Sequence, residues 1–331
     1  MKFLDVRRAR DSILRDYCRD VLVWRDVERG VRCTNAVGRD APRADRNDLF
    51  RRALLDWDVV SGGQREVDSA GRGGDVEGDS VLAGERVAFL PRHGVGHRIL
   101  PSEIPARANI HALKQLGVEF ILSVSAVGSL REDIEPLHIV VPDQLIDRTR
   151  GRASTFFGDG IVAHIAFADP FCPELRALLA EATREAGATV HNGGTLVVIE
   201  GPAFSTRAES NLYRSWGADI IGMTALPEAK LAREAEICYA ILACATDYDV
   251  WHDTHEDVSA EMIVANLLRN VEVSRNAVRL ALERLPDVRN CACPHALRDA
   301  MVTRLDVAPA KTKRRLAPIL SAYVPQEVAG G

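Results

Sequence analysis

The sequence predicts an α/β fold, with a single domain over about residues 80–290. Apolar runs of strand length alternate with segments of helical periodicity, and the connections between them are short, which is typical of a sheet flanked by helices. One run, residues 237–245, is apolar at nearly every position, so we expect a central strand that is buried on both faces.

The elements follow one another regularly after about residue 80. A helix over residues 106–116 is stopped by Gly117, and Pro173 stands at the favoured first turn of a helix that runs to residue 186. Ser259 can cap a last long helix that reaches residue 285. Strands are expected at residues 86–90, 119–124, 138–141, 195–199, 218–221 and 237–245, and further helices at 205–216 and 227–236.

The N-terminal segment, residues 1–75, differs in composition from the rest of the chain. It contains 15 Arg but one Lys, and 12 Asp but two Glu, and it shows no sustained periodicity. We consider two interpretations: the segment has little fixed structure, or part of it is translated from a wrong reading frame of GC-rich DNA.

Composition excludes several classes of protein. The 331 residues are 47% hydrophobic and 27% charged, and the formal charge of −5 argues against a nucleic-acid partner. No apolar run approaches the roughly 18 residues of a membrane helix, and the N-terminus lacks the apolar core of a signal peptide. Seven cysteines, few and odd in number, predict a reducing cytoplasm.

Five of the seven cysteines fall into two groups. Cys172, Cys238 and Cys244 lie in apolar settings and are expected in the core. Cys291 and Cys293 begin a C-terminal tail, residues 291–331, and form a Cys-x-Cys motif. This pair could close a small strained disulfide, touch a metal together with His295, or remain as two reduced thiols in a surface tail.

Polar side chains follow several predicted strands. Asp247 and Asp249 come directly after the central run, and in an open α/β sheet ligands bind beyond the carboxyl ends of strands. Two carboxylates two residues apart can point the same way in an extended chain, where they could meet a flat ligand. By itself the pair is more typical of a solvated acidic turn.

Other strand ends add complementary groups, each weak alone. Arg92 beside His93 makes an anion clamp, Ser125 opens a turn of small residues, Thr224 adds a hydroxyl, and Phe204 offers a flat ring. The set would suit a nucleoside with phosphate on one side of its ribose and a purine on the other.

These pieces resemble, in order and wording, the 5′-methylthioadenosine phosphorylases of the trimeric purine nucleoside phosphorylase superfamily. The resemblance covers residues 81–285, about two-thirds of the chain. It is carried by FLPRHG (89–94), RANIHALK (107–114), GSLRE (128–132), DQLIDR (143–148), PFCP (170–173), IEGPAFS (199–205), RAES (207–210), WGAD (216–219) and ATDYD (245–249), with Trp251.

The resemblance implies a fold and a reaction. The fold would be a central mixed, partly barrel-like β-sheet flanked by helices. The reaction would be phosphorolysis of methylthioadenosine to adenine and 5-methylthioribose 1-phosphate, in a cytoplasmic homotrimer or hexamer. Inorganic phosphate would be the co-substrate, with no metal and no other cofactor, and with neither nucleic acid nor membrane as a partner.

The resemblance also implies roles for individual residues. Asp247 would protonate N7 of the purine as the glycosidic bond breaks, and Asp249 would accept from the 6-amino group; a buried Asp with a raised pKa can act as such an acid. The remaining expected positions are phosphate-binding Arg92, His93, Ser125, Ala126 and Thr224; Phe204 and Met223 at base and ribose; and, on the 5′ side, Ala260, Ile263, Val264 and, reaching a neighbouring subunit, His164.

Two departures from the family pattern matter. Gly222 stands where the family usually has Asn, which removes an amide near the base. The family also begins with a strand into Gly-Gly-Thr-Gly or Gly-Gly-Ser-Gly, which cradles phosphate, and the closest fragment here is Ser61-Gly62-Gly63 with no apolar strand before it. A chain without that loop is expected to have weak activity or none.

Three alternatives to this function remain open at the level of sequence. One is a phosphorylase of broader or 6-oxopurine specificity, which Asp249 disfavours because a carboxylate accepts from an amine but repels a carbonyl oxygen. Another is a catalytically impaired homologue that still assembles or binds purine. A nucleotide-binding regulator is the third, and the absence of a basic excess weakens it.

Overall fold

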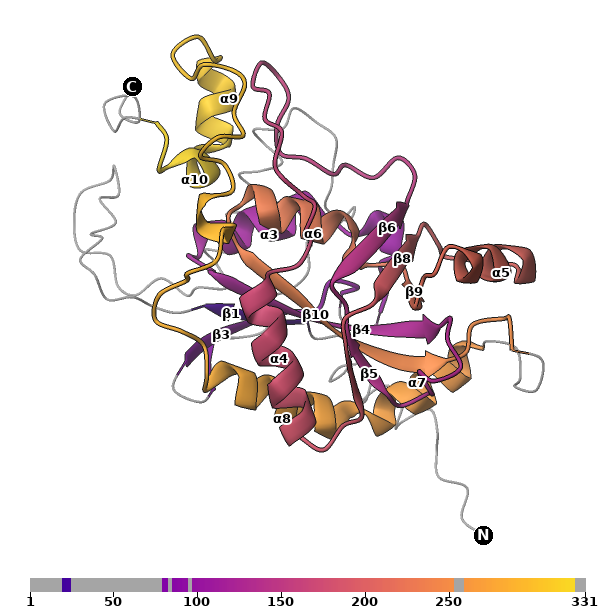
Figure 1. The fold of residues 1–331 in the computed structure, drawn as a ribbon. Coiled ribbons are helices and arrows are strands. Elements are labelled where there is room, and N and C mark those ends of the chain that lie inside the picture. The colour runs from indigo at the N-terminus through magenta and orange to yellow at the C-terminus, as the bar shows by residue number, and fades with distance from the viewer. Residues whose placement is uncertain (1–19, 25–78, 83–84, 95–96, 253–258, 325–331) are drawn as a thin grey trace.

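The computed structural model describes residues 20–24, 79–82, 85–94, 97–252 and 259–324. These form an α/β fold in which a mixed β-sheet lies between helices (Figure 1). The fold predicted from the sequence is therefore confirmed. Ser61, Gly62 and Gly63, the fragment nearest to the expected phosphate loop, lie outside the described residues.

The sheet is built from ten described strands. Its main path runs β2-β3-β1-β4-β10-β5-β7, and β4 also pairs with β9, which continues through β8 to β6. The strands are β1 (Asp20–Trp24), β2 (Asp79–Leu82), β3 (Glu85–Leu90), β4 (Phe120–Ser129), β5 (Ile139–Val141), β6 (Gln144–Arg148), β7 (Val190–Asn192), β8 (Thr195–Ile199), β9 (Ile220–Gly222) and β10 (Cys238–Asp247).

Helices cover both faces of the sheet (Figure 1). On one face lie α3 and α6, and on the other α4 and α8, while α5 stands at one end (Figure 1). The described helices are η1 (Pro101–Glu103), α3 (Ala106–Gln115), α4 (Pro173–Glu185), α5 (Arg207–Ser215), α6 (Ala225–Glu234), α7 (Ala260–Arg269), α8 (Val271–Leu282), η2 (Cys293–His295), α9 (Ala310–Arg315) and α10 (Ala317–Leu320). Among them, no helix is both long and apolar enough to cross a bilayer.

The central strand β10 is buried along its whole length, as its sequence predicts. Its side chains alternate between two cores: Tyr239 and Ile241 pack on the α3 and α6 side, and Ala240 and Leu242 on the α4 and α8 side. This alternation follows from the two-residue period of a strand, and it explains why neither face of the run can be polar.

Two predicted elements differ from the structure. Residues 125–129, expected as a turn after a strand, continue β4 to Ser129 because they pair with β10 on one side and, at Gly128 and Ser129, with β9 on the other. The single helix expected over 259–285 is divided at Asn270 into α7, which packs on β10, and α8, which packs on α4.

The N-terminal segment contains a strand that was not predicted from its sequence. Asp20–Trp24 form β1, which lies between β3 and β4. It pairs antiparallel to β4, with Val21 opposite Leu122 and Val23 opposite Phe120. The carboxyl end of β1 therefore lies beside the amino end of β4. The strand ends described next lie at the opposite end of β4.

Candidate active site

The candidate site lies at the carboxyl ends of β4 and β10. These strands are parallel, with Ser125 opposite Ala243 and Gly128 opposite Asp247, and a bulge interrupts the register between Ala245 and Asp247. Three residues of strand, about 10 Å, separate the level of Ser125 from that of Asp247. That span matches one nucleoside, so groups at the two levels can contact opposite ends of it.

Arg92, Ser125 and Thr224 come together at the first level. The Arg92 guanidinium, which is 3% exposed, donates to Ser125 Oγ at 2.8 Å and to Ser123 Oγ at 2.9 Å. Ser125 Oγ lies 3.4 Å from Thr224 Oγ1. Three of the expected phosphate-binding residues thus meet at one place: Arg92 just after β3, Ser125 in the second half of β4, and Thr224 just after β9.

The Arg92 charge is partly balanced by a carboxylate that sequence patterns did not single out. Glu228 lies 2.7 Å from Arg92 Nη1, and Tyr239 Oη donates to the same carboxylate at 3.0 Å. Both partners of this ion pair are buried, so loss of either would leave a buried charge uncompensated. The ion pair with Glu228 holds the Arg92 guanidinium in place, and the guanidinium in turn orients the Ser125 hydroxyl to which it donates.

Ala126 is expected to bind phosphate, and its backbone is the part that faces this place. Arg92 donates to the Val124 carbonyl at 2.9 Å, and the Val127 carbonyl lies 3.2 Å from Thr246 Oγ1, on the β10 side. Alternate residues of a strand direct their backbone groups to opposite edges, so the N–H of Ala126 faces the Arg92 edge. Along that edge β4 pairs with β1 up to Leu122 and with β9 from Gly128, which leaves residues 123–127 without a described strand partner.

His93 is a neutral imidazole in this structure. Burial, with the Arg92 and His97 charges nearby, lowers its pKa to about 3. Its Nδ1 lies 2.8 Å from the carbonyl oxygen of Ile99, which can only accept, so Nδ1 carries the proton and Nε2 presents a lone pair. The ring stacks on His97 with 4.1 Å between centroids, which fixes its orientation.

Asp247 and Asp249 occupy the second level. Asp247 is 4% exposed; Thr246 Oγ1 donates to its Oδ2 at 2.7 Å and the Asp249 N–H donates to its Oδ1 at 2.8 Å. Burial raises the pKa of Asp247 to about 6 despite these bonds. A carboxyl that keeps its proton to that pH is suited to general-acid catalysis near neutrality.

Asp249 presents an acceptor that has no partner among the described residues. It is 7% exposed and its Oδ2 makes no hydrogen bond. The hydroxyls of Ser205 and Ser210 lie nearby and oppose the rise in the pKa of Asp249 that burial causes. Both hydroxyls are buried, and neither makes a hydrogen bond to a described residue. Its backbone is left-handed, with φ of 51°, a strain that is retained at functional sites.

Gly128 makes room for both carboxylates. A Cβ at this position would lie 2.9 Å from Asp247 Oδ1, 3.0 Å from Ile221 Cγ2 and 3.4 Å from Asp249 Cβ. The first contact is shorter than real Cβ atoms show, so any other residue would displace the Asp247 carboxylate. Glycine is therefore required here by close approach rather than by backbone dihedral.

The loops after β8 and β9 carry Phe204 and Met223, the residues expected at base and ribose. Phe204 is 43% exposed. Met223 packs against Gly201, where a Cβ would lie 2.5 Å from its Sδ, so the two loops are in direct contact. The aromatic ring is thus displayed on a loop whose position depends on the neighbouring strand end.

Arg152 holds these loops together, and no sequence signal pointed to it. Its guanidinium donates to the carbonyls of Met223 and Leu226 at 2.7 Å each and to that of Glu200 at 2.6 Å, and its Nε lies 3.1 Å from the Glu200 carboxylate. The side chain is 4% exposed. A lone arginine after glycine is common in loops, so this role required the structure.

The expected 5′-side residues divide into two places. Ala260, Ile263 and Val264 lie on the first turns of α7, and Asn266 of the same helix donates to the Thr246 carbonyl at 2.7 Å, which ties α7 to the end of β10. His164 is not brought to this group. It is exposed, and its N–H bonds to Ala300 in the C-terminal part of the chain, so its role toward a neighbouring subunit stays a prediction.

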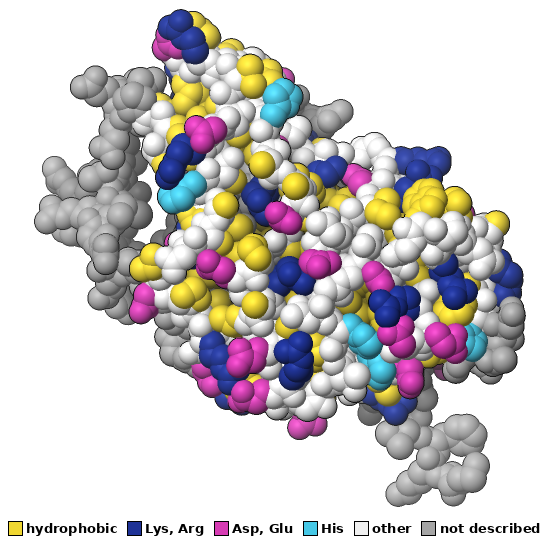
Figure 2. Space-filling model, in the orientation of Figure 1, with side chains coloured by type: hydrophobic (Ala, Val, Ile, Leu, Met, Phe, Trp, Pro, Cys, Tyr) yellow, Lys and Arg dark blue, Asp and Glu magenta, His cyan; other side chains and the backbone are white. Residues whose placement is uncertain are grey.

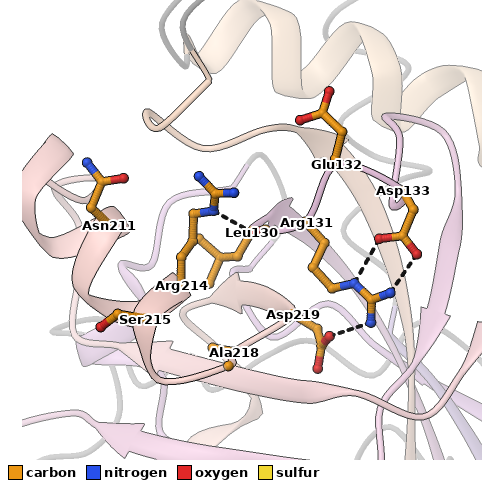
Figure 3. Close-up of a pocket in the computed structure, with 10 residues that line it drawn as sticks. Leu130, Arg131, Glu132, Asp133, Asn211, Arg214, Ser215, Ala218 and Asp219 are labelled. Carbon is orange, nitrogen blue, oxygen red and sulfur yellow. Dashed lines mark hydrogen bonds and ion pairs between the residues drawn. The ribbon is translucent and has the colours of Figure 1, made fainter.

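A separate hollow of about 540 Å³ lies next to α5 (Figure 3). It contains none of the expected site residues, and one of its arginines, Arg131, is already paired, with Asp133 at 2.6 Å and Asp219 at 2.8 Å. Its lining consists of Leu130, Arg131, Glu132, Asp133, Asn211, Arg214, Ser215, Gly217, Ala218 and Asp219. Because no buried acid or unpaired acceptor faces it, we place the site at the strand ends instead.

A mixed sheet with an anion-binding corner and a buried acid at neighbouring strand ends defines an enzyme of the nucleoside phosphorylase type. The family model described as "Phosphorylase superfamily" matches residues 61–283. The S-methyl-5′-thioadenosine phosphorylase of Geobacter sulfurreducens is 60% identical over 245 residues, 74% of this chain and 86% of that protein. That of Thermofilum pendens is 50% identical over 221 residues, 67% and 84% of the two chains.

The similar solved structures are methylthioadenosine phosphorylases as well. A methylthioadenosine phosphorylase from an antarctic soil metagenomic library is 52% identical, with a TM-score of 0.68 over 72% of this chain and 84% of that one. An adenosine/methylthioadenosine phosphorylase mutant from Schistosoma mansoni, in complex with adenine, is 40% identical, with a TM-score of 0.58 over 59% and 77%. The chain therefore belongs to the phosphorylase superfamily and, within it, to the S-methyl-5′-thioadenosine phosphorylase family.

Proposed function

We propose that this protein catalyses phosphorolysis of 5′-methylthioadenosine to adenine and 5-methylthioribose 1-phosphate, a step of purine and methionine salvage. The observation that carries the proposal is the pair of carboxylates at the end of β10. Asp247 is an acid with a pKa near 6, and Asp249, two residues later, has a buried oxygen without a hydrogen-bond partner among the described residues. The names of the similar proteins support the same substrate.

The residues suggest a sequence of bond changes. A phosphate oxygen attacks C1′ of the ribose while the bond from C1′ to N9 of adenine breaks, and the proton of Asp247 passes to N7 of the leaving base. Asp249 Oδ2 accepts from the 6-amino group and so orients the ring. Because the ribose becomes cation-like, the phosphate charge stabilises the transition state as well as supplying the nucleophile.

Phosphate is proposed to bind between Arg92, Ser125, Thr224 and the Ala126 N–H. His93 in its neutral form accepts through Nε2 from a hydroxyl, of the phosphate monoanion or of the ribose, and would become a donor only if the bound anion raises its pKa. The chemistry uses no metal ion and no organic cofactor, since an acid, a charged nucleophile and a positioned base account for every step.

Assembly and location form a second part of the proposal. We expect a cytoplasmic homotrimer, or a hexamer, in which His164 of one subunit reaches the 5′ side of its neighbour's site. The exposure of His164 and the fixing of its segment to the C-terminal part of the same chain support this role. On the face shown in Figure 2, basic and acidic side chains are interspersed, which suits a small-molecule substrate better than a nucleic acid.

The direction of β1 supports one competing function, a homologue that binds purine without turnover. In the family pattern the first strand leads into the phosphate loop. Here the carboxyl end of β1 lies beside the amino end of β4, away from Ser125. The described part of the N-terminal segment, β1, is therefore not placed like the first strand of the family pattern. If the chain functions as given, we expect slow phosphorolysis.

The two functions are separated by one assay with two readouts. Adenine release from methylthioadenosine is measured with and without phosphate, and adenine binding is measured by calorimetry on the same preparation. Release that depends on phosphate supports the enzyme. Adenine binding without release supports the impaired homologue, and absence of both refutes the assignment of the site.

A further inference from the structure

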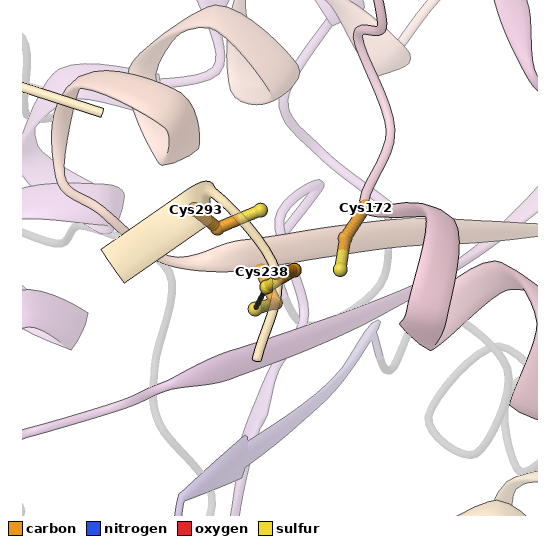
Figure 4. Close-up of side chains that lie close together, drawn as sticks. Cys172, Cys238 and Cys293 are labelled. Carbon is orange, nitrogen blue, oxygen red and sulfur yellow. Dashed lines mark hydrogen bonds between the residues drawn. The ribbon is translucent and has the colours of Figure 1, made fainter. Parts of the chain in front are cut away.

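Four cysteine thiols from three separate segments meet at the amino end of β10. Cys238 is the first residue of that strand, Cys172 precedes α4, and Cys291 and Cys293 come from the segment after α8, as Figure 4 shows for three of them. Asp247 lies at the other end of β10, nine residues or about 30 Å away. The cluster is therefore independent of the candidate active site.

The sulfur atoms are spaced for a shared ligand. All four Sγ atoms lie within 4.8 Å of one another, and Cys238 Sγ and Cys291 Sγ are 3.4 Å apart. A tetrahedral zinc ion with Zn–S bonds of about 2.3 Å requires sulfur atoms about 3.8 Å apart. A disulfide needs about 2.05 Å and joins only two sulfurs, whereas here all four surround one centre.

The cluster is enclosed and its backbone is fixed. Cys172, Cys238 and Cys293 are buried, and Cys291 is half-buried. The N–H of Cys172 bonds to the Tyr239 carbonyl at 2.9 Å, and the N–H of Cys238 bonds to the Glu119 carbonyl at 2.9 Å. Four protein ligands without an open position characterise structural rather than catalytic metal sites.

We propose that Cys172, Cys238, Cys291 and Cys293 bind one thiophilic divalent cation of the Zn²⁺ class. His295, which the sequence suggested as a ligand with the Cys-x-Cys pair, is exposed and outside the four-thiol group, and the thiols do not lie in a surface tail. The ion cross-links the start of β10, the start of α4 and the C-terminal part of the chain, so that residues 291–324 are held against the sheet.

The test uses the full-length protein, purified with a thiol reductant and without chelator. We expect about one equivalent of zinc by elemental analysis after growth with zinc, and a thiolate-to-cobalt charge-transfer band when the metal-free protein is titrated with Co²⁺. Zinc should raise the Tm of the metal-free protein by at least about 5 °C. Absence of the charge-transfer band, or recovery of disulfides between these cysteines under reducing purification, would overturn the proposal.

Two variants assign the ligands. Cys291→Ser changes the least buried thiol and should reduce zinc affinity at least tenfold with the fold retained by circular dichroism. Cys244→Ser is the matched control, because Cys244 is a buried thiol of the same strand that contacts Ser274 and lies outside the cluster. Equal zinc affinity in the two variants would refute the assignment.

Discussion

Burial of Asp247 links the chemistry of one residue to pH. Its pKa is raised to about 6 in the folded protein, above the value of about 3.9 in an unfolded chain. Below pH 6 the free protein holds the proton that the leaving purine needs, and above it the protonated fraction falls tenfold per pH unit. We expect kcat/KM for methylthioadenosine to decline above an apparent pKa near 6, and Asp247→Asn to lower kcat by about 10²–10⁴.

The same shift predicts a change in stability. Because the folded state binds this proton more tightly than the unfolded state, the stabilisation is complete below about pH 3.9 and is lost as the pH rises through 6. The free energy of unfolding of wild type minus that of Asp247→Asn should therefore fall by about 1.4 kcal/mol between pH 5 and pH 8, measured by urea titration. A difference that is constant with pH would contradict the shift.

Asp249 is expected to set the preference for the purine. Its unpaired Oδ2 accepts from a 6-amino group, and Asp249→Asn offers a donor that suits a 6-oxo group instead. Comparison of adenosine with inosine should show the ratio of their kcat/KM values shift toward inosine by at least tenfold. If turnover is too slow, the affinities for adenine and hypoxanthine give the same comparison, and an unchanged ratio would remove Asp249 from base recognition.

Gly128 is expected to tolerate no side chain. Gly128→Ala places a Cβ 2.9 Å from Asp247 Oδ1 and should abolish adenine binding, while Gly222→Ala on the neighbouring strand meets Val127 at 3.3 Å and should have a smaller effect. Calorimetric titration with adenine measures both, and circular dichroism confirms folding. Equal binding by the two variants would show that the carboxylate can move.

At the scale of elements, the site depends on side chains that join loops and helices. Arg152 bonds four carbonyls and one carboxylate around the ends of β8 and β9, so Arg152→Met leaves those acceptors without these bonds. We expect a loss of about 2–4 kcal/mol in stability and weaker nucleoside binding. Arg150→Ala is the control, because only its backbone N–H bonds Glu200. Similar urea midpoints for the two variants would refute this role.

At the scale of the whole molecule, the open question of sequence is the N-terminal segment, where the family pattern has its phosphate loop. The matched family region begins at residue 61, and β1 runs antiparallel to β4. If residues 1–75 are read in a wrong frame, another frame of the same DNA should encode an apolar strand that leads into Gly-Gly-Thr-Gly or Gly-Gly-Ser-Gly. Resequencing and translation in all three frames test this, and absence of such a reading would refute the frame interpretation.

The sequence alone predicted the alternation of strands and helices and the buried strand β10, which the structure confirms, and it named candidate site residues at strand ends. These signals are local, since periodicity, capping residues and apolar runs depend on neighbours in the chain. The predicted boundaries of elements differ from the structure in two kinds of place. Pairing extends a strand as far as Ser129, and packing on two partners divides a helix at Asn270.

Only the tertiary structure decided which groups meet. The Glu228 carboxylate on Arg92, the Arg152 contacts, the close approach of Gly128 to Asp247 and the four-thiol cluster all join residues that are distant in sequence. The placement of β1 likewise depends on sheet pairing, because its five residues carry no pattern that sets their direction. Contacts between distant segments follow from the packing of the whole sheet, and no local pattern encodes them.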